Sequence, residues 1–330
     1  MTKPFSVIQG GLGAAGPGAW RAELRHPLSL SDAETAAWRG LMGRTLEPSV
    51  YAEPDFVLTM AQHLADGRTL ALLLVWQGEA TLRGVLPLRL PSGLGLPGQA
   101  CLWRLPLSGR AEAVIDRDHA PAVLRAALEH LAGSRLRVTD LRLPDLRPDG
   151  PLAIALGAVA GATGRRLTVA AQPAPRPDAR PPLARAEGRT SLERVREPRQ
   201  VRDAIEQFLV LDARQGRDSL IADPARATAF RVAVRRFARR RQACVDLVRR
   251  DGTVVAAAIH LASGPCDAVW RQAGLCLSET GAPPHEAGRV EAIVAVEARS
   301  PAARRGPGGS ALKHRAGTLL RRLARTGRRA

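Results

Sequence analysis

Aromatic residues are scarce in this chain: they make up 3% of its 330 residues, whereas hydrophobic residues of all kinds make up 45%. Any hydrophobic core must therefore be built mainly from Leu, Val and Ala side chains. Since a domain typically holds about 150 residues, the length predicts two domains, each with enough apolar side chains for a core of its own.

Cysteine is also rare, and its pattern argues against two classes of small protein. The four cysteines, Cys101, Cys244, Cys266 and Cys276, include no CxxC pair and have no histidines interleaved at zinc spacing. This pattern argues against a zinc module and against a disulfide framework. We interpret the four residues as reduced core cysteines, and we expect no metal cofactor.

Long apolar runs are missing as well. No stretch reaches the roughly 18 residues of a membrane span, and the N-terminus lacks the continuous apolar segment of a signal peptide. We therefore expect a cytoplasmic protein without a transmembrane segment.

Acidic residues are absent from one part of the chain. Residues 301–330 hold eight Arg and one Lys but no Asp or Glu, so this tail supplies half of the net charge of +18. Such basic charge serves nucleic acid, an anionic surface or a phosphorylated ligand. Composition alone does not choose among these partners.

Apolar periodicity and turn residues divide the chain into five parts. We predict a flexible lead-in over residues 1–25, a first α/β domain over 26–171, a Pro/Arg-rich linker over 172–191, a second domain over 192–300 and a basic tail over 301–330.

The two domains begin with the same order of elements. In the first, two helices precede a hairpin, and Ser31 with Glu34 forms the capping-box pattern at the start of the first helix. In the second, helices that begin near Pro198 and Pro224 again precede a hairpin. In the first domain a helix, a strand, a helix and a strand follow. The repeated order predicts two similar α/β units in tandem.

The clearest local signal is the hairpin of the second domain. Two β-branched runs, Cys244–Val248 and Val254–Leu261, flank the pair Asp251-Gly252. Asp-Gly favours the positive φ angles that a tight hairpin turn needs. A third short run ends at Trp270, and we expect these strands to form the centre of the second sheet.

Several stretches together resemble a known family. They are AWRGLMGRTLEPSVYAEPDF at residues 37–56, VLPLRL at 85–90, FLVLDARQGRD at 208–218 and DLVRRDGTVVAAAIHLASG at 246–264. Over roughly residues 30–275 the chain is similar to GNAT-type N-acyltransferases of the FemAB-like, cellulose-biosynthesis CelD-like branch. The likeness extends over many positions, and none of these stretches contains a catalytic signature.

The resemblance implies two GNAT-like units, each a mixed, mostly antiparallel sheet flanked by helices. It also implies transfer of an acyl group from acetyl-CoA or another acyl-CoA to an amine or hydroxyl, or from an aminoacyl-tRNA in FemAB proteins proper. The acceptor would be a small molecule or a glycan precursor in cell-envelope or polysaccharide assembly. Two features depart from the family: the segment Ala184–Arg196 between the domains is short, and no aromatic residue follows Trp270.

GNAT proteins hold the coenzyme A diphosphate with backbone amides and cations, usually at a glycine-rich turn before a helix. Their R-x-x-G-x-G/A pattern has an approximate match in the tail, after the strand-like Ala292–Val296. The matching residues, which we name as candidate cofactor-binding residues, are Arg305, Gly306, Gly308, Gly309 and Ser310. The alternative interpretation is a solvated basic tail in which this string arises by chance.

Acyl transfer also needs a base that takes the proton of the attacking group. His260 is the first candidate, because it interrupts an apolar strand. The alternative is a histidine on the solvent face of the strand, or one that is satisfied in the core. Weaker candidates are Asp212, Glu206, His285 and Glu286.

Our leading hypothesis is an acyl-CoA-dependent acyltransferase built from two GNAT-like domains. The rival hypothesis is a non-catalytic member of the same fold that binds nucleic acid or an anionic surface through its basic tail. The two differ in the ligand that they require, acyl-CoA or a polyanion.

Overall fold

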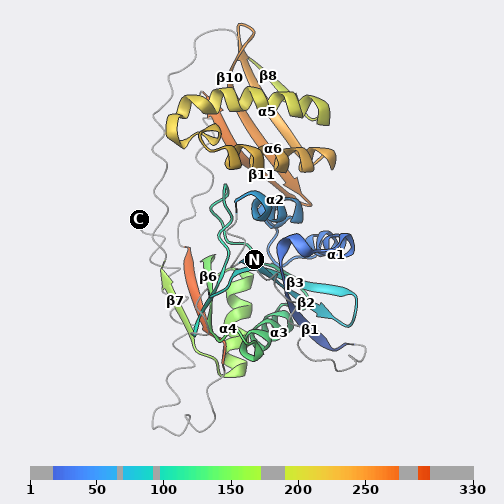
Figure 1. The fold of residues 1–330 in the computed structure, drawn as a ribbon, viewed down its shortest axis with the longest axis vertical. Helices are drawn as coiled ribbons and strands as arrows, with labels where there is room; N and C mark the ends of the chain where they lie inside the picture. Colours follow the sequence, from blue (N-terminus) through green and yellow to red (C-terminus); the bar gives the residue numbers. More distant parts are fainter. Residues whose placement is uncertain (1–17, 65–69, 92–96, 172–189, 275–288, 298–330) are drawn as a thin grey trace, which may run out of the picture.

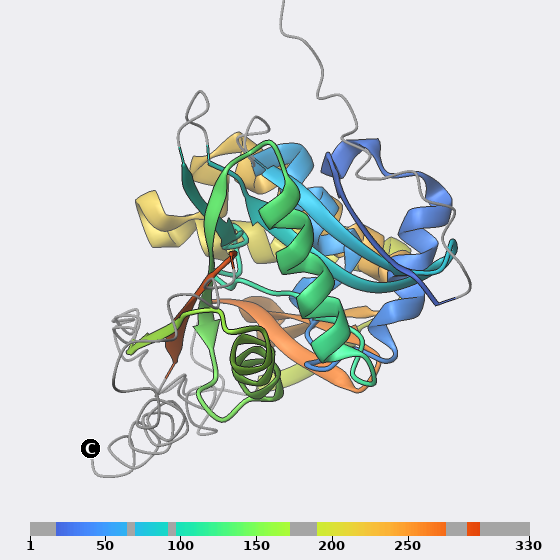
Figure 2. The same ribbon diagram turned by 90° about the horizontal axis from the view of Figure 1, so that it is seen from below.

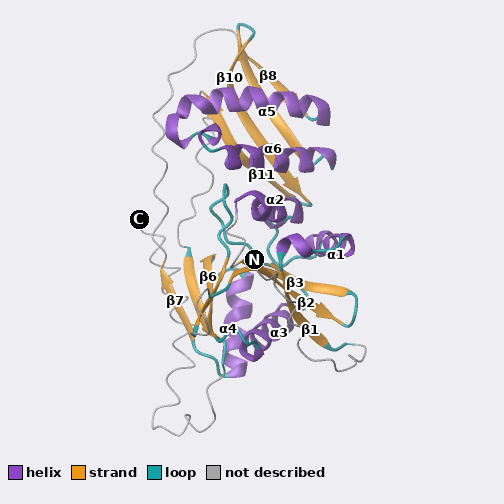
Figure 3. Cartoon of the chain, viewed as in Figure 1, coloured by secondary structure: helices purple, strands orange, loops and turns teal. Residues whose placement is uncertain are grey.

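The computed structural model describes residues 18–64, 70–91, 97–171, 190–274 and 289–297. Within these ranges the chain forms an eight-stranded sheet and a four-stranded sheet, stacked along the long axis of the molecule with helices between and around them (Figure 1, Figure 3). We call each sheet with its helices the first and the second unit. The fold class is mixed α/β, as predicted.

The first unit contains one parallel pair of strands in an otherwise antiparallel sheet. Its strands lie in the order β1-β2-β3-β4-β6-β12-β7, with the short β5 paired to β3, and only β4 and β6 run parallel. The strands are β1 Trp20–Arg25, β2 Leu70–Gln77, β3 Thr81–Arg89, β4 Gly98–Leu102, β5 Val114–Ile115, β6 Val138–Leu146, β7 Leu167–Ala171 and β12 Val290–Ala295. The helices are η1 Pro27–Ser29, α1 Asp32–Met42, η2 Val50–Ala52, α2 Pro54–Leu64, α3 Ala120–Gly133 and α4 Pro151–Thr163.

The second unit is smaller and antiparallel throughout its described residues. Its strands lie in the order β11-β10-β9-β8. They are β8 Thr190–Val195, β9 Ala243–Arg250, β10 Thr253–Ser263 and β11 Cys266–Gly274. The helices are α5 Pro198–Asp212, η3 Ala213–Asp218, η4 Leu220–Ala222 and α6 Pro224–Arg239.

The two units share one topology at their start. In each, a strand, two α-helices and three further strands follow in sequence, and the strands lie side by side as β1-β2-β3-β4 and as β8-β9-β10-β11. The predicted tandem repeat is therefore confirmed. Among the described residues, only the first unit continues into α3, β6, α4 and β7.

Local signals account for several element boundaries. Ser31 and Glu34 form the capping box of α1, and the Asp223 side chain accepts hydrogen bonds from the amides of Ala225 and Arg226 at the start of α6. In the hairpin between β9 and β10, Asp251 and Gly252 have φ angles of 50° and 80°. Two positive φ angles in a row characterise the turn that Asp-Gly predicts.

Strand β2 is buried on both faces and separates two cores. Its even-numbered residues from Leu70 to Trp76 pack toward α1 and α2, whereas Ala71, Leu73 and Val75 pack toward α3 and α4. This explains why the strand reads as an uninterrupted apolar run in the sequence.

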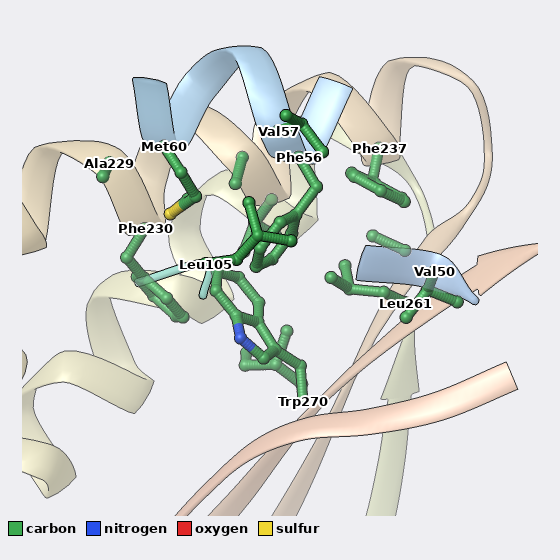
Figure 4. Close-up of a cluster of buried hydrophobic side chains, with 14 of the residues drawn as sticks. Val50, Phe56, Val57, Met60, Leu105, Ala229, Phe230, Phe237, Leu261 and Trp270 are labelled. Atoms are coloured by element: carbon green, nitrogen blue, oxygen red, sulfur yellow. The ribbon is translucent and has the colours of Figure 1, made fainter. Parts of the chain in front are cut away.

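The core on the α1 and α2 side continues into the second unit. Phe56 of α2 and Phe230 of α6 both pack on Trp270 of β11, with ring centroids 5.2 Å apart in each pair (Figure 4). We call this shared cluster of buried side chains the junction core; among the residues labelled in Figure 4 it includes Val50, Met60, Phe237 and Leu261. One apolar core thus joins the two units.

Strand β12 lies in the first sheet, although it follows the second unit in sequence. It pairs antiparallel with β6 on one side and with β7 on the other (Figure 2). The predicted second domain of residues 192–300 is therefore too long at its end, because residues 290–295 belong to the first sheet. Buried Val290 and Val294 fill the first unit's core there, which a local pattern cannot reveal.

Two further boundaries differ from the prediction. Residues Trp20–Arg25, placed in the flexible lead-in, form β1 and pair along β2. Strand β8 begins at Thr190, inside the predicted linker of residues 172–191. None of the described helices has the length and apolar character needed to cross a membrane.

Candidate functional site

Polar side chains from three neighbouring strands meet on one face of the second sheet. Val245 of β9 and Ile259 of β10 are fully buried in the junction core, on the face that α5 and α6 cover. Because side chains alternate along a strand, Asp246 and His260 project from the opposite face. Arg194 of β8 joins them there.

The strand register brings these side chains into contact. Arg194 is directly opposite Asp246, and Ala258 lies opposite Asp246 on the other side. Arg194 Nε and Nη2 donate hydrogen bonds of 2.7 Å to the two carboxylate oxygens of Asp246. His260 Nε2 lies 3.2 Å from Asp246 Oδ2. We call this arrangement across β8, β9 and β10 the Arg–Asp–His row.

A β-bulge coincides with the histidine. Ile259 lies opposite Arg271, whereas His260 lies opposite Val269, so Trp270 is an extra residue on β11. Bulges bend a strand locally, re-aim side chains and are common next to active sites. Here the bulge turns Trp270 into the junction core, and its indole Nε1 donates to the carbonyl of Leu107 in the first unit at 3.1 Å.

The charges in the row keep Asp246 ionised. Hydrogen bonds from Arg194 lower the pKa of the Asp246 carboxyl against the opposing effect of burial, and His260 adds to the lowering. The same contact raises the pKa of Arg194. A carboxylate beside Nε2 favours the ring tautomer with its proton on that nitrogen. The other nitrogen, Nδ1, is then the proton acceptor, and it lies 4.0 Å from the exposed carboxylate of Asp267.

The row can be reached from solvent. The His260 side chain is 18% exposed, and two apolar side chains on the same sheet, Leu192 and Val269, are 63% and 46% exposed. A molecule that approaches this face meets apolar surface around the partly exposed His260. Such an arrangement can take a proton from an amine or a hydroxyl.

Cys244 is the residue opposite His260 on β9, but its thiol is not activated. Burial raises the pKa of the Cys244 thiol, and the charge of Asp246 raises it further. Since the thiolate is the nucleophilic form of cysteine, this residue does not suit covalent catalysis. The row therefore supports acid–base chemistry.

The other predicted base candidates are not part of the row. The Asp212 carboxylate is buried and accepts hydrogen bonds from Ser219 Oγ and the Leu220 amide, which is a structural role. Glu206 pairs with Arg231 on the surface between α5 and α6. His285 and Glu286, and the candidate cofactor residues Arg305, Gly306, Gly308, Gly309 and Ser310, lie outside the described residues.

A coenzyme A diphosphate would need free amides and cations at a turn before a helix. In the first unit, the turn between β5 and α3 contains the fully buried Asp116. Its carboxylate accepts hydrogen bonds from Arg44 at 2.7 Å, Arg83 at 2.8 Å and the Asp118 amide at 3.0 Å. A protein carboxylate already uses these groups, so this turn does not fit a diphosphate. The corresponding segment of the second unit, residues 275–288, lies outside the described residues.

Arg194 and Asp246 are functional candidates that the sequence analysis missed. A signal for Asp246 was present, because it is the one acid in the apolar run Cys244–Val248. Pairing the two strands across the predicted Asp251-Gly252 turn would have placed it near His260. Arg194 had no such signal, since its strand follows the linker.

The segment that contains the Arg–Asp–His row is similar to a known protein family. Residues 179–274 match a family model described as an acetyltransferase (GNAT) domain. None of the curated proteins matches the chain.

Two solved structures that are similar to this chain have low sequence identity to it. A tandem GNAT protein from the clavulanic acid biosynthesis pathway, solved without AcCoA, is 14% identical with a TM-score of 0.34, over 79% of this chain and 81% of its own. FemX is 12% identical with a TM-score of 0.47, over 77% of this chain and 81% of its own. The family match begins ahead of β8 and ends with β11, so the four-stranded sheet that carries the Arg–Asp–His row is the part of this chain that is similar to a GNAT acetyltransferase domain.

Proposed function

We propose that the chain is an acyltransferase that uses an acyl-CoA, and that His260 is its general base. The match of residues 179–274 to a GNAT domain supports the reaction class. The contact of 3.2 Å between His260 Nε2 and Asp246 Oδ2 is the observation that carries the role of the histidine. The acceptor is an amine or a hydroxyl on a small molecule or a glycan precursor.

The row supplies proton transfer for this reaction. The acceptor atom forms a bond to the acyl carbon, the bond between that carbon and the thioester sulfur breaks, and the acceptor gives up one proton. His260 takes this proton on Nδ1, and Asp246 stabilises the resulting imidazolium. The proton then leaves the histidine for the sulfur of the departing thiol. Arg194 holds Asp246 in position and does not touch the reacting atoms.

The exposed apolar side chains beside the row favour an acceptor with an apolar part. Leu192 and Val269 border the face from which a substrate would reach His260. Apolar contacts there would orient the acceptor, while the histidine would select for a group with an ionisable proton.

His260→Ala should lower kcat/KM for acyl transfer by on the order of a hundredfold or more, because general-base catalysis contributes roughly this factor. Release of coenzyme A thiol measures the rate, with acetyl-CoA as donor and a panel of amines and amino sugars as acceptors. His63→Ala in the last turn of α2, away from the row, is the matched control and should keep wild-type turnover.

A melting experiment separates loss of the base from loss of the binding site. Saturating acyl-CoA should raise the melting temperature of the wild type and of His260→Ala alike, by mass action. Unchanged turnover in His260→Ala, with any acceptor that the wild type uses, contradicts the assignment of the base. The absence of any response to acyl-CoA contradicts the proposed reaction class.

A further inference from the structure

A pocket of about 480 Å³ lies where the first unit meets α6 of the second, within the size range of small-molecule sites. Residues of η1, α1 and α2 form one side of it, and the last turns of α6 form the other; these helices lie close together in the middle of the molecule (Figure 1). Helix α6 covers the face of the second sheet that is opposite to His260. The pocket is therefore separate from the Arg–Asp–His row.

The lining of this pocket is rich in arginine. Four guanidinium groups line it, together with the carboxylates of Asp32 and Asp55. The arginines are Arg39, Arg236, Arg239 and Arg240. So many cations around one concave surface indicate a site for an anion, provided that some of them are free to bind it.

Buried carboxylates hold two of the four arginines. Arg240 Nη1 donates to Glu53 Oε2 and to Asp55 Oδ2, both at 3.0 Å, and Arg39 Nη2 donates to Asp55 Oδ1 at 3.0 Å. Glu53 and Asp55 are 2% and 7% exposed, and Ser263 Oγ of the second unit also donates to Glu53. These contacts fix the positions of Arg39 and Arg240 at the wall of the pocket.

The other two arginines have no such neutralisation. Arg236 and Arg239 are three residues apart on α6, so they lie on the same side of the helix. Arg236 Nη1 donates to Thr59 Oγ1 of α2 at 3.0 Å, and in the part of the chain that the structure describes neither arginine pairs with a carboxylate. Positive charge thus remains available on the α6 side.

The opposite wall is mixed. Leu28, Leu30 and Leu58 contribute apolar surface, and Asp32, Thr35 and Gln62 contribute polar groups. A ligand that fills the pocket would place a charged group against α6 and an apolar group against η1 and α2.

We propose that this pocket binds a small organic phosphate ester. A guanidinium presents a planar fork of N–H groups that matches two phosphate oxygens, and two guanidinium groups match the double charge of a phosphate monoester. The organic part of the ligand packs against Leu28, Leu30 and Leu58. Arg39 and Arg240 border the site, each paired with a buried carboxylate.

Stabilisation of α6 by its basic C-terminal residues does not explain the whole arrangement. Arg236 and Arg239 lie in the last turn of α6, where basic side chains interact favourably with the helix dipole. That effect needs only cations near the helix end. It does not account for their meeting with Arg39, from another helix and the other unit, around one pocket.

Calorimetric titration of the full-length protein tests the proposal, with phenyl phosphate and inorganic phosphate as probes at constant ionic strength in chloride. We expect saturable binding of both, tighter for phenyl phosphate because its ring can pack against the three leucine side chains. Arg236→Gln and Arg239→Gln should each weaken binding roughly tenfold, because each removes charged hydrogen bonds. Arg235→Gln removes the same charge from the same helix outside the pocket, and it should bind like the wild type.

Three results would overturn the proposal: no saturable binding to the wild type, unchanged binding in both pocket variants, or equal weakening in Arg235→Gln. Thermal melting followed by circular dichroism checks that each variant folds. Arg239 is exposed, so Arg239→Gln tests the pocket even if Arg236→Gln unfolds.

Two additional arms identify the source of the phosphate and separate the two proposals. Displacement of phenyl phosphate by coenzyme A would assign the pocket to the phosphates of the acyl donor; binding of phenyl phosphate without such displacement would assign it to another phosphate ester. His260→Ala should bind phenyl phosphate like the wild type. If His260 proved not to be the general base, the measured binding of phenyl phosphate to the pocket would still stand.

Discussion

At the scale of single residues, two carboxylates of this chain are each held by basic side chains, with different consequences. Asp116 is fully buried and accepts hydrogen bonds from Arg44, which follows α1, from Arg83 of β3 and from the Asp118 amide ahead of α3. Asp246 is held by Arg194 on an open sheet face and also contacts His260. The first carboxylate serves the fold, whereas the second contacts a histidine whose side chain is partly exposed.

Asp116 should make the stability of the protein depend on acidic pH. Burial alone would raise the pKa of this carboxyl, but hydrogen bonds from Arg83 and Arg44 outweigh burial and lower the pKa to about 2 from an ordinary value of 3.8. A depressed pKa contributes stability that is present above the unfolded-state value and is lost as the pH falls through the folded-state value. We expect this group to account for a loss of about 2 kcal/mol in unfolding free energy between about pH 5 and pH 2.

Urea unfolding across this pH range measures the effect. The curve of Asp116→Asn should lack that share of the pH dependence. Asp118→Asn alters an exposed neighbour and should keep it. Identical pH dependence in the wild type and in Asp116→Asn would show that the ion pairs do not stabilise the folded state.

At the scale of elements, the short strand β12 completes the first sheet. It is inserted between β6 and β7, so both of those strands have a hydrogen-bonded partner along this side only because residues 290–295 return to the first unit. Val290, Ala292 and Val294 point into the core of that unit, and Glu291 pairs with Arg142 of β6.

Val294→Ala should destabilise the first unit by about 2 kcal/mol, because it removes two buried methyl groups and leaves a cavity in a fully packed core. Hydrogen exchange should show the largest loss of protection in β6 and β7, the two strands that β12 joins. Ile293→Ala, on the less buried face of the same strand, is the control and should have a smaller effect. Equal effects of the two changes would argue against the inward packing of Val294.

At the scale of the whole molecule, the junction core makes the two units one structure. Trp270 is central to it, because its ring touches Phe56 of the first unit and Phe230 of the second and its Nε1 donates to Leu107. An interface built from buried aromatic rings is expected to unfold together with the domains that it joins.

Trp270→Ala should lower the free energy of unfolding by about 3–5 kcal/mol, the usual range for loss of a large buried side chain. Unfolding followed by hydrogen exchange should report both units at the same denaturant concentration in the wild type. Val269→Ala changes the adjacent residue, whose side chain is 46% exposed, and should have little effect. Separate wild-type transitions for the two units would contradict a shared core.

The sequence was informative wherever the determining contacts are local. The capping box of α1, the prolines at the starts of α5 and α6 and the Asp251-Gly252 turn each act within a few residues, and the structure confirms all three signals. The order of these elements was sufficient to predict the tandem repeat. His260 was selected because a polar residue interrupts an apolar run, and it does belong to the Arg–Asp–His row.

By itself, then, the sequence determined the helices, the hairpins and their repetition, because caps, turns and apolar periodicity depend on neighbours in the chain. Only the tertiary structure decided that β12 completes the first sheet, that Trp270 joins two cores, that Arg194 and Asp246 accompany His260, and that four arginines surround one pocket. Those arrangements depend on strand pairing and packing between segments far apart in sequence. No local pattern encodes such pairings, since they are selected by the fit of whole sheets and helices against one another.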